Sequence, residues 1–243
     1  MEVILIMIGF IVIFSAGLVQ GATSFGFSLL SVPLLSIFLP LKIIVPMLVI
    51  YSFIMNSIIL YQIREYVKLK RISLLIISAV IATPIGANLL INLDESILKI
   101  IVGVIVTISS ILFHFGYKIK VDNEKLAYVP VGIVSGLLNG SVSISGPPVI
   151  LFLTNQGTEK QVFRATLTAY FWILNIMTIA IFIYKKLITI EVLKFTSYLL
   201  PALIVGVLIG VKLGNKVEEE TFKKLTTVLI VIMGILSIIS GLR

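Results

Sequence analysis

Residues 135–153, which read SGLLNGSVSISGPPVILFL, gather hydrogen-bonding residues and helix breakers in the middle of an apolar chain. The glycines lack side chains, and Pro147 and Pro148 lack the N–H group that a helix interior requires. In lipid, such a break in the backbone is tolerated only where protein buries it or where it lines a wet cavity. The stretch is therefore predicted to be part of a binding site, with Asn139, Gly140, Ser141, Ser143, Ser145, Gly146 and Pro147 as candidate residues.

A weaker copy of this motif lies near the N-terminus. Residues 21–28 read GATSFGFS, and Val32 and Pro33 follow them. The glycines again favour a break, and the hydroxyl groups again offer hydrogen bonds. The candidate residues here are Thr23, Ser24, Gly26 and Ser28.

Both motifs offer hydrogen-bond donors. A helix that begins after a break presents free N–H groups and the positive end of its dipole. The serine and threonine hydroxyls and the amides of Asn56, Asn139 and Asn175 would add to them. This combination suits a small anion that is held without a full countercharge. The alternative is that the small residues only allow helices to pack closely, and we favour that interpretation for Gly86, Gly103, Gly206 and Gly210.

Acidic residues are informative because of where they are absent. The 11 aspartates and glutamates all fall in connections or at the ends of apolar segments. The sequence therefore predicts no acid–base pair, no carboxylate metal site and no carboxylate proton relay. No enzyme and no cofactor are expected. The single histidine, His114, stands near the end of a segment and is interpreted as an interfacial residue, with proton handling as the minor alternative.

The composition is that of an integral membrane protein. Of the 243 residues, 59% are hydrophobic and 12% are charged, and there is no cysteine. A typical soluble domain is about half apolar and a quarter charged. The net charge of +8 lies in short connections, so it is expected to meet lipid headgroups rather than nucleic acid. Residues 1–20 are interpreted as an uncleaved helix. Apolar segments are predicted at 3–20, 23–39, 42–63, 72–92, 97–117, 126–139, 144–156, 161–184, 188–211 and 221–242.

The two halves of the chain resemble each other. Residues 51–56 read YSFIMN and residues 170–175 read YFWILN; residues 85–89 read IGANL and residues 209–213 read IGVKL. The small-residue motif comes early in each half. These matches occur in the same order, which predicts an internal duplication. We expect one transmembrane domain, 1–243, with repeat one at 1–120 and repeat two at 121–243.

Five segments in each half would place the second repeat upside down in the membrane. Under that topology, all but six of the 19 basic residues fall on one side, which the positive-inside rule makes cytoplasmic, with both termini outside. The six exceptions are Lys42, Lys99, Lys185, Lys186, Lys194 and Arg243. The predicted fold is thus an all-α polytopic membrane protein of two inverted repeats, each a helical hairpin plus three transmembrane helices. The second hairpin has predicted arms of about 13 residues, too short to cross fully; re-entrant hairpins would bring both motifs together near the midplane.

Two further residues are singled out near the second motif. Arg164 is interpreted as a headgroup anchor, with a role in guiding an anion as the alternative. Trp172 lies well inside a predicted helix, where it serves either core packing or a cavity wall.

The motifs GATSFGFSLLSVPLL and SGLLNGSVSISGPPVILFL, with the GANLL and GVKLG repeats, resemble those of the sulfite exporter TauE/SafE family, also called toluene-sulfonate uptake permeases. The first motif departs from the family pattern, because Ala22 and Thr23 stand where relatives often have glycine. The resemblance implies a multi-pass transporter in the cytoplasmic membrane, most often exporting sulfite, sulfonates or related organic anions.

The expected partners are a small anionic substrate and membrane lipids, and homo-oligomerisation is left open. The alternative functions are an anion channel or a transporter of small carboxylates; a membrane enzyme is the weakest reading. The substrate-binding residues expected on these grounds are Thr23, Ser24, Gly26, Ser28, Asn56, Asn139, Gly140, Ser141, Ser143, Ser145, Gly146, Pro147 and Asn175.

Overall fold

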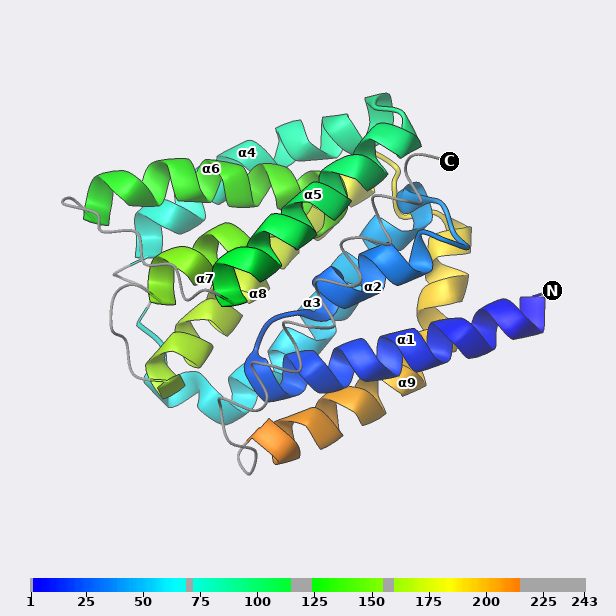
Figure 1. The fold of residues 1–243 in the computed structure, drawn as a ribbon, viewed down its shortest axis with the longest axis horizontal. Coiled ribbons are helices and arrows are strands. Elements are labelled where there is room, and N and C mark those ends of the chain that lie inside the picture. The colour runs from blue at the N-terminus through cyan, green and yellow to red at the C-terminus, as the bar shows by residue number, and fades with distance from the viewer. Residues whose placement is uncertain (1, 69–71, 115–123, 155–159, 215–243) are drawn as a thin grey trace.

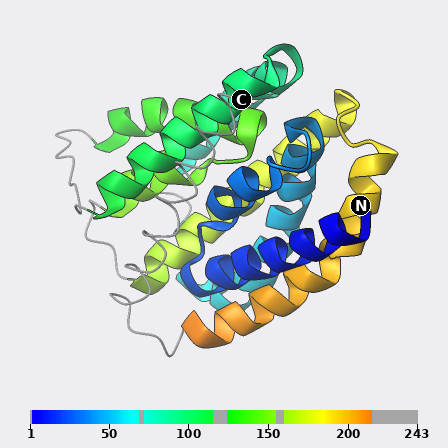
Figure 2. The same cartoon turned by 45° about the vertical axis from the view of Figure 1, so that its right-hand side comes forward.

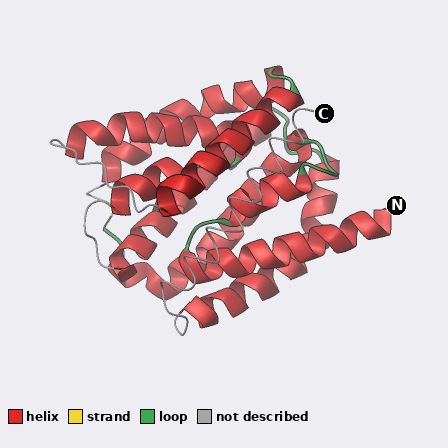
Figure 3. Cartoon of the chain, viewed as in Figure 1, coloured by secondary structure: helices red, strands yellow, loops and turns green. Residues whose placement is uncertain are grey.

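The computed structural model describes residues 2–68, 72–114, 124–154 and 160–214. Every regular element within these ranges is a helix (Figures 1 and 3). The elements are α1 (Glu2–Thr23), α2 (Phe27–Leu35), α3 (Leu41–Ile63), the 3₁₀-helix η1 (Arg64–Tyr66), α4 (Ser73–Asn92), α5 (Glu95–His114), α6 (Glu124–Val142), α7 (Gly146–Thr154), α8 (Lys160–Tyr184) and α9 (Ile190–Gly214). The predicted segment 221–242 and the side chain of His114 lie outside the described part.

Five of these helices are long and apolar enough to cross a membrane. They contain the spans Ile6–Thr23, Leu41–Tyr66, Ser73–Asn92, Gln161–Tyr184 and Ile190–Gly214. Helices α2 and α7 have nine residues each, or ~14 Å at 1.5 Å per residue, which is less than half of a ~30 Å hydrocarbon core. The prediction of an all-α polytopic membrane protein is confirmed.

The helices form two outer pairs around a central pair. Helix α1 lies beside α9 along one edge of the molecule, α4 lies beside α6 along the other, and α3 and α8 lie between them (Figure 1). The short helix α2 packs against α3, the short helix α7 packs against α8, and α5 packs against α2, α7 and α6 (Figures 1 and 2). The short helices therefore lie against the central pair.

Glycines set the close approach in both outer pairs. A β-carbon on Gly86 of α4 would collide with the carbonyl oxygen of Leu137 in α6, and one on Gly210 of α9 would collide with the carbonyl oxygen of Leu18 in α1. Gly206 faces the carbonyl oxygen of Phe14 in the same way. Small residues that let backbones approach are the usual basis of helix pairing in membranes. The close-packing reading of these glycines is confirmed.

From α1 to the start of α3, the elements of the first half recur in the second half 119 residues later, whereas the IGANL and IGVKL motifs of α4 and α9 are 124 residues apart. The 119-residue spacing separates Thr23 from Val142, at the ends of α1 and α6, and the nine-residue helices Phe27–Leu35 and Gly146–Thr154. It also relates the first residues of α3 and α8, Leu41 and Lys160. One expectation about the hairpins is wrong: α6 has 19 residues rather than about 13, and only the second arm, α7, is short.

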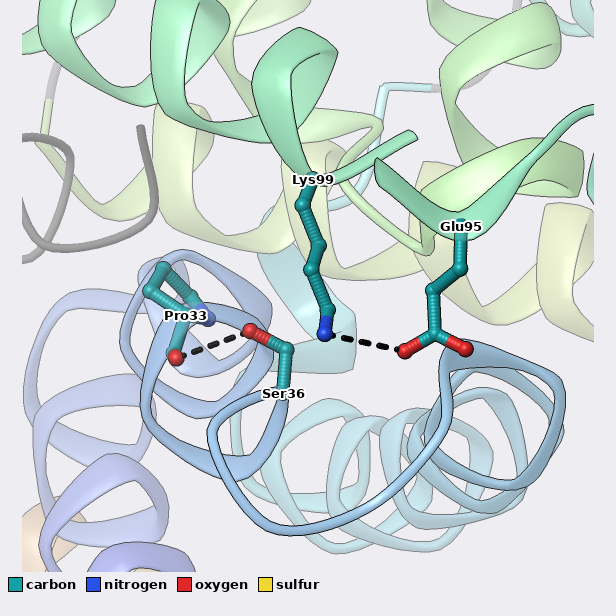
Figure 4. A network of polar contacts seen from close by, with 4 residues as sticks. All are labelled: Pro33, Ser36, Glu95 and Lys99. Carbon is teal, nitrogen blue, oxygen red and sulfur yellow. Dashed lines mark hydrogen bonds and ion pairs between the residues drawn. The ribbon is translucent and has the colours of Figure 1, made fainter. Parts of the chain in front are cut away.

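The end of α2 lies beside the start of α5 (Figure 4). The Ser36 hydroxyl donates to the carbonyl of Pro33 at 2.9 Å and so closes the last turn of α2. On the first turn of α5, Lys99 pairs with Glu95 at 3.1 Å (Figure 4). Because both of these charged side chains are partly exposed, the pair contributes little to stability.

Substitution of Gly210 by alanine tests the glycine contacts. Gly210→Ala is expected to lower the free energy of unfolding by about 1–3 kcal/mol, because backbone atoms of α1 cannot move aside as a side chain can. The measurement is thermal or denaturant unfolding of the purified protein in detergent.

The matched control is Gly9→Ala in α1. The new methyl group there would meet only the Leu199 side chain, with a nearest distance of 3.0 Å, which can rotate away. We expect its stability to stay near that of the wild type. Equal effects of the two substitutions would contradict the assignment of close backbone contact at Gly210.

Candidate functional site

Two helix breaks form the centre of the molecule, and they have the same local geometry. Helix α1 ends at Thr23 and is followed by Ser24 at φ 68°; α6 ends at Val142 and is followed by Ser143 at φ 59°. The N–H groups of these serines still bond back to the helix, to Gln20 O at 2.7 Å and to Asn139 O at 3.1 Å. Left-handed conformations are uncommon for residues other than glycine and mark sites that the surrounding structure holds in place.

The two breaks meet. The hydroxyl oxygen of Ser28, in the first turn of α2, lies 3.4 Å from that of Ser143. A cavity of about 30 Å³ lies at this meeting point and takes its walls from both halves of the chain. A void of this size holds a ligand of only a few non-hydrogen atoms.

Eight of the thirteen predicted site residues line this cavity. They are Gly26, Ser28 and Asn56 from the first half, and Asn139, Ser143, Ser145, Gly146 and Asn175 from the second. No acidic side chain is among the described residues that line it. The sequence motifs thus converge on one place, as predicted for two hairpins that approach each other.

The other five predicted residues do not line the cavity. The hydroxyls of Thr23 and Ser141 bond to helix carbonyls of Val19 and Leu137, at 2.8 Å and 2.7 Å. A β-carbon on Gly140 would meet the carbonyl oxygen of Thr83, so this glycine serves the pairing of α6 with α4. Ser24 and Pro147 are buried.

Helix N-termini were expected to supply donors from both motifs, and the structure leaves the second motif with fewer of them. Helix α7 begins at Gly146, so Pro147 and Pro148 occupy its next two positions and supply no N–H group. Helix α2 begins at Phe27, so the N–H groups of Phe27, Ser28 and Leu29 have no acceptor within the helix. All three of these residues line the cavity.

Three polar or aromatic residues that were not predicted as site residues also line the cavity: Gln20, Ser52 and Phe171. Gln20 is buried in the last turn of α1, where its amide nitrogen donates to the side-chain oxygen of Asn56 at 3.2 Å. Its amide oxygen accepts the N–H of Phe27 at 3.1 Å. The signal that could have identified it is its position, because Gln20 stands 119 residues before Asn139.

The side-chain amide of Asn56 is buried, and only one of its two polar atoms is hydrogen-bonded. Its side-chain oxygen accepts from Gln20, while its nitrogen, Nδ2, makes no hydrogen bond to any described residue. The whole residue is 0% exposed. A buried donor without an acceptor costs about 1–3 kcal/mol, so this group at the cavity wall is a strong candidate for contact with a ligand.

The second break is held by different residues. The Ser135 hydroxyl donates to the carbonyl of Ser145 at 2.7 Å and lies 2.6 Å from the hydroxyl of Tyr170. The amide nitrogen of Asn139 donates to the Thr178 hydroxyl at 2.7 Å. All of these bonds lie within the second half.

Arg164 is placed differently from the expectation. It is 4% exposed, so its interpretation as a headgroup anchor is wrong. Its guanidinium donates to the Ser24 hydroxyl and to the carbonyl of Gly21, each at 3.2 Å. A cation is favourable at the C-terminus of a helix, so Arg164 of α8 stabilises the end of α1. Among the described residues, no carboxylate forms an ion pair with it.

Trp172 packs between the central helices. Its indole N–H donates to the Ser57 hydroxyl at 2.9 Å, and its ring stacks on Phe53 with the centroids 6.0 Å apart. It is not among the residues that line the cavity. Trp172 is partly buried, so the described contacts place it in the packing between α3 and α8 rather than in the cavity wall.

Taken together, these features define a polytopic helical membrane protein whose central site offers neutral donors from two broken helices. The chain belongs to the sulfite exporter TauE/SafE family, whose model matches residues 9–237. No curated protein and no solved structure matches the chain. The resemblance identified from the motifs is thus confirmed across nearly the whole sequence.

Replacement of Arg164 tests its role at the end of α1. Arg164→Met removes both hydrogen bonds and leaves a buried carbonyl of Gly21 unpaired, so the free energy of unfolding should fall by about 1–3 kcal/mol. Unfolding in detergent measures the change. Lys194→Met removes the same charge from an exposed position on α9 and should leave stability near the wild-type value. A headgroup anchor would instead give two similar, small effects.

Proposed function

We propose that the protein is a secondary transporter or facilitator of small anions that exports sulfite, sulfonates or related sulfur-containing organic anions across the cytoplasmic membrane. The observation that carries the proposal is the cavity between the two helix breaks, with hydrogen-bond donors from both halves and no acidic side chain among its described lining residues. A small oxyanion accepts several hydrogen bonds and needs no full countercharge in such a place.

The anion sits nearer to the first break in this proposal. The N–H groups of Ser28 and Leu29 and the free amide nitrogen of Asn56 are the donors at that end. Hydroxyls of Ser143 and Ser145 face the same cavity from the second half. Arg164 lies behind the first break and makes the potential there more positive, although it is not one of the lining residues.

The two halves act as inverted repeats that rock against each other, with repeat one at 1–120 and repeat two at 121–243. Three features support this proposal: the 119-residue spacing that relates α1, α2 and α3 to α6, α7 and α8, the nine-residue length of both α2 and α7, and the position of the cavity between the halves. The contact between Ser28 and Ser143 crosses from one half to the other, and so do the bonds of Arg164. Rocking would exchange these contacts and open the cavity to alternate sides.

Export needs no coupling ion in this scheme. Both termini lie outside, as the distribution of basic residues favours, and the cell interior is negative. Moving one negative charge outward then gains about 2.3 kcal/mol per 100 mV. The membrane potential alone is therefore a sufficient driving force for a uniporter.

The test is uptake and efflux of labelled sulfite, a small sulfonate and a carboxylate in proteoliposomes. We expect saturable transport of a sulfur anion, and Ser145→Leu should reduce it at least about tenfold, because leucine fills much of the small cavity. Ser197→Leu on the exposed face of α9 makes the same chemical change away from the cavity and should transport normally.

The alternative functions give different results in the same assay. Transport of the carboxylate without either sulfur anion would replace the substrate class. Ion currents far above transporter turnover would indicate a channel. If no anion moves, the small residues of the two motifs serve helix packing alone.

A further inference from the structure

We propose that Gln20 is a built-in competitor of the transported anion and thereby sets the affinity of the site. In the empty protein its amide oxygen occupies the N-terminus of α2, and the anion takes its place there. This inference rests on the proposed anion site and assigns a role to a residue that the motifs do not include.

The first argument is the position of the Gln20 amide oxygen. It accepts the N–H of Phe27 at 3.1 Å, which is the first N–H group of α2. The residue before the helix, Gly26, has no side chain and makes no side-chain cap. Gln20 therefore caps α2 from the preceding helix, at the point where the helix dipole favours a negative charge.

The second argument is the incomplete pairing that results. The Gln20 nitrogen donates to Asn56 Oδ1 at 3.2 Å and to the carbonyl of Ser24 at 3.3 Å, which leaves Asn56 Nδ2 buried and unpaired. An anion at the same place could accept both the Phe27 N–H and the Asn56 Nδ2 group. One oxyanion thus satisfies a donor that Gln20, with a single amide oxygen, does not reach.

The third argument is the contrast with the other half. Asn139 stands at the position equivalent to Gln20, but its amide donates to the Thr178 hydroxyl, and no bond connects it to the start of α7. Helix α7 also lacks two early N–H groups because of Pro147 and Pro148. The exchange between an internal acceptor and an external anion is therefore confined to the first half.

In the transport cycle the exchange is a side-chain rotation. Gln20 leaves the Phe27 N–H when the anion arrives and returns when it departs, so the first N–H group of α2 stays paired in the empty protein. Binding of the anion must break the hydrogen bond between Gln20 and Phe27, and this free-energy cost lowers the affinity for the anion. The lower affinity favours release.

Two substitutions at Gln20 distinguish a side chain that competes with the anion from one that only stabilises the start of α2. Gln20→Met keeps the length of the side chain and removes the competing oxygen, so KM for the anion should fall several-fold. Gln20→Glu places a permanent carboxylate at the N-terminus of α2, where Phe27 and a reoriented Asn56 amide can donate to it. Transport should then drop below about a tenth of the wild-type rate, since the site is filled from within.

The readouts are KM and maximal rate in proteoliposomes, and the unfolding temperature of the purified protein with and without sulfite. Without anion, Gln20→Glu should unfold at or above the wild-type temperature at neutral pH, and sulfite should not raise it further. Asn88→Asp, on an exposed part of α4 beside Lys185, adds the same charge and should behave as the wild type in both assays.

A purely structural Gln20 predicts another pattern: both substitutions would lower stability and maximal rate while KM stays constant. That result overturns the inference and leaves the proposed function standing. If the wild type transports no anion, the unfolding temperatures of the two variants still test whether the start of α2 accepts an anion. A Gln20→Glu protein less stable than Gln20→Met would mean that the start of α2 does not accept an anion, whereas the reverse order supports the inference even though the transport proposal has failed.

Discussion

The structure depends on one constraint, which is that the polar backbone groups at two interrupted helices must find partners inside a largely apolar bundle. In lipid an unpaired N–H or carbonyl group costs several kcal/mol, so a break must be braced by the protein around it. Ser24 and Ser143 end their helices in the same left-handed conformation, and side chains then supply the missing partners. Gln20 and Arg164 do so at the first break, and Ser135 does so at the second. The breaks are therefore ordered features, and the cavity exists because their tips meet.

The two breaks share a backbone shape but are braced by unrelated chemistry. At the spacing of 119 residues, Ser135 corresponds to Ala16 and Arg164 corresponds to Val45. Neither of these hydrogen-bonding side chains therefore has a counterpart in the other half. The first break is held partly by the second half, through Arg164, whereas the bonds of Ser135 and Asn139 at the second break stay within its own half and only the long Ser143–Ser28 contact crosses to the other. The cavity thus has two unlike ends. One end offers mainly backbone N–H donors, and the other offers mainly hydroxyl and amide side chains.

Much of the fold could be predicted because helix length and apolar composition are local properties. Runs of about 20 apolar residues predict spanning helices, and the clustered glycines, serines and prolines predict where they break. Eight of the predicted site residues line the cavity for the same reason. Gln20 could not be found in this way, since one amide in an apolar run has no local signature and its partners are distant in sequence. Arg164 was misread because a basic residue near a helix end usually reaches the headgroups, and only the tertiary structure places the end of α1 against it.

Under the proposed function, the placement of Arg164 accounts for both the attraction and the release of the anion. A guanidinium in direct contact with a bound anion inside a low-dielectric bundle would hold it strongly. Here the guanidinium bonds to the Gly21 carbonyl and the Ser24 hydroxyl instead, and neutral groups form the described wall of the cavity. Its charge offsets the negative end of the α1 dipole, which would otherwise repel an anion at this break. The contact between the halves at Ser28 and Ser143 is long, at 3.4 Å, and therefore weak, so its exchange for other contacts costs little. A site built in this way favours passage over retention, which is the property that a transporter requires.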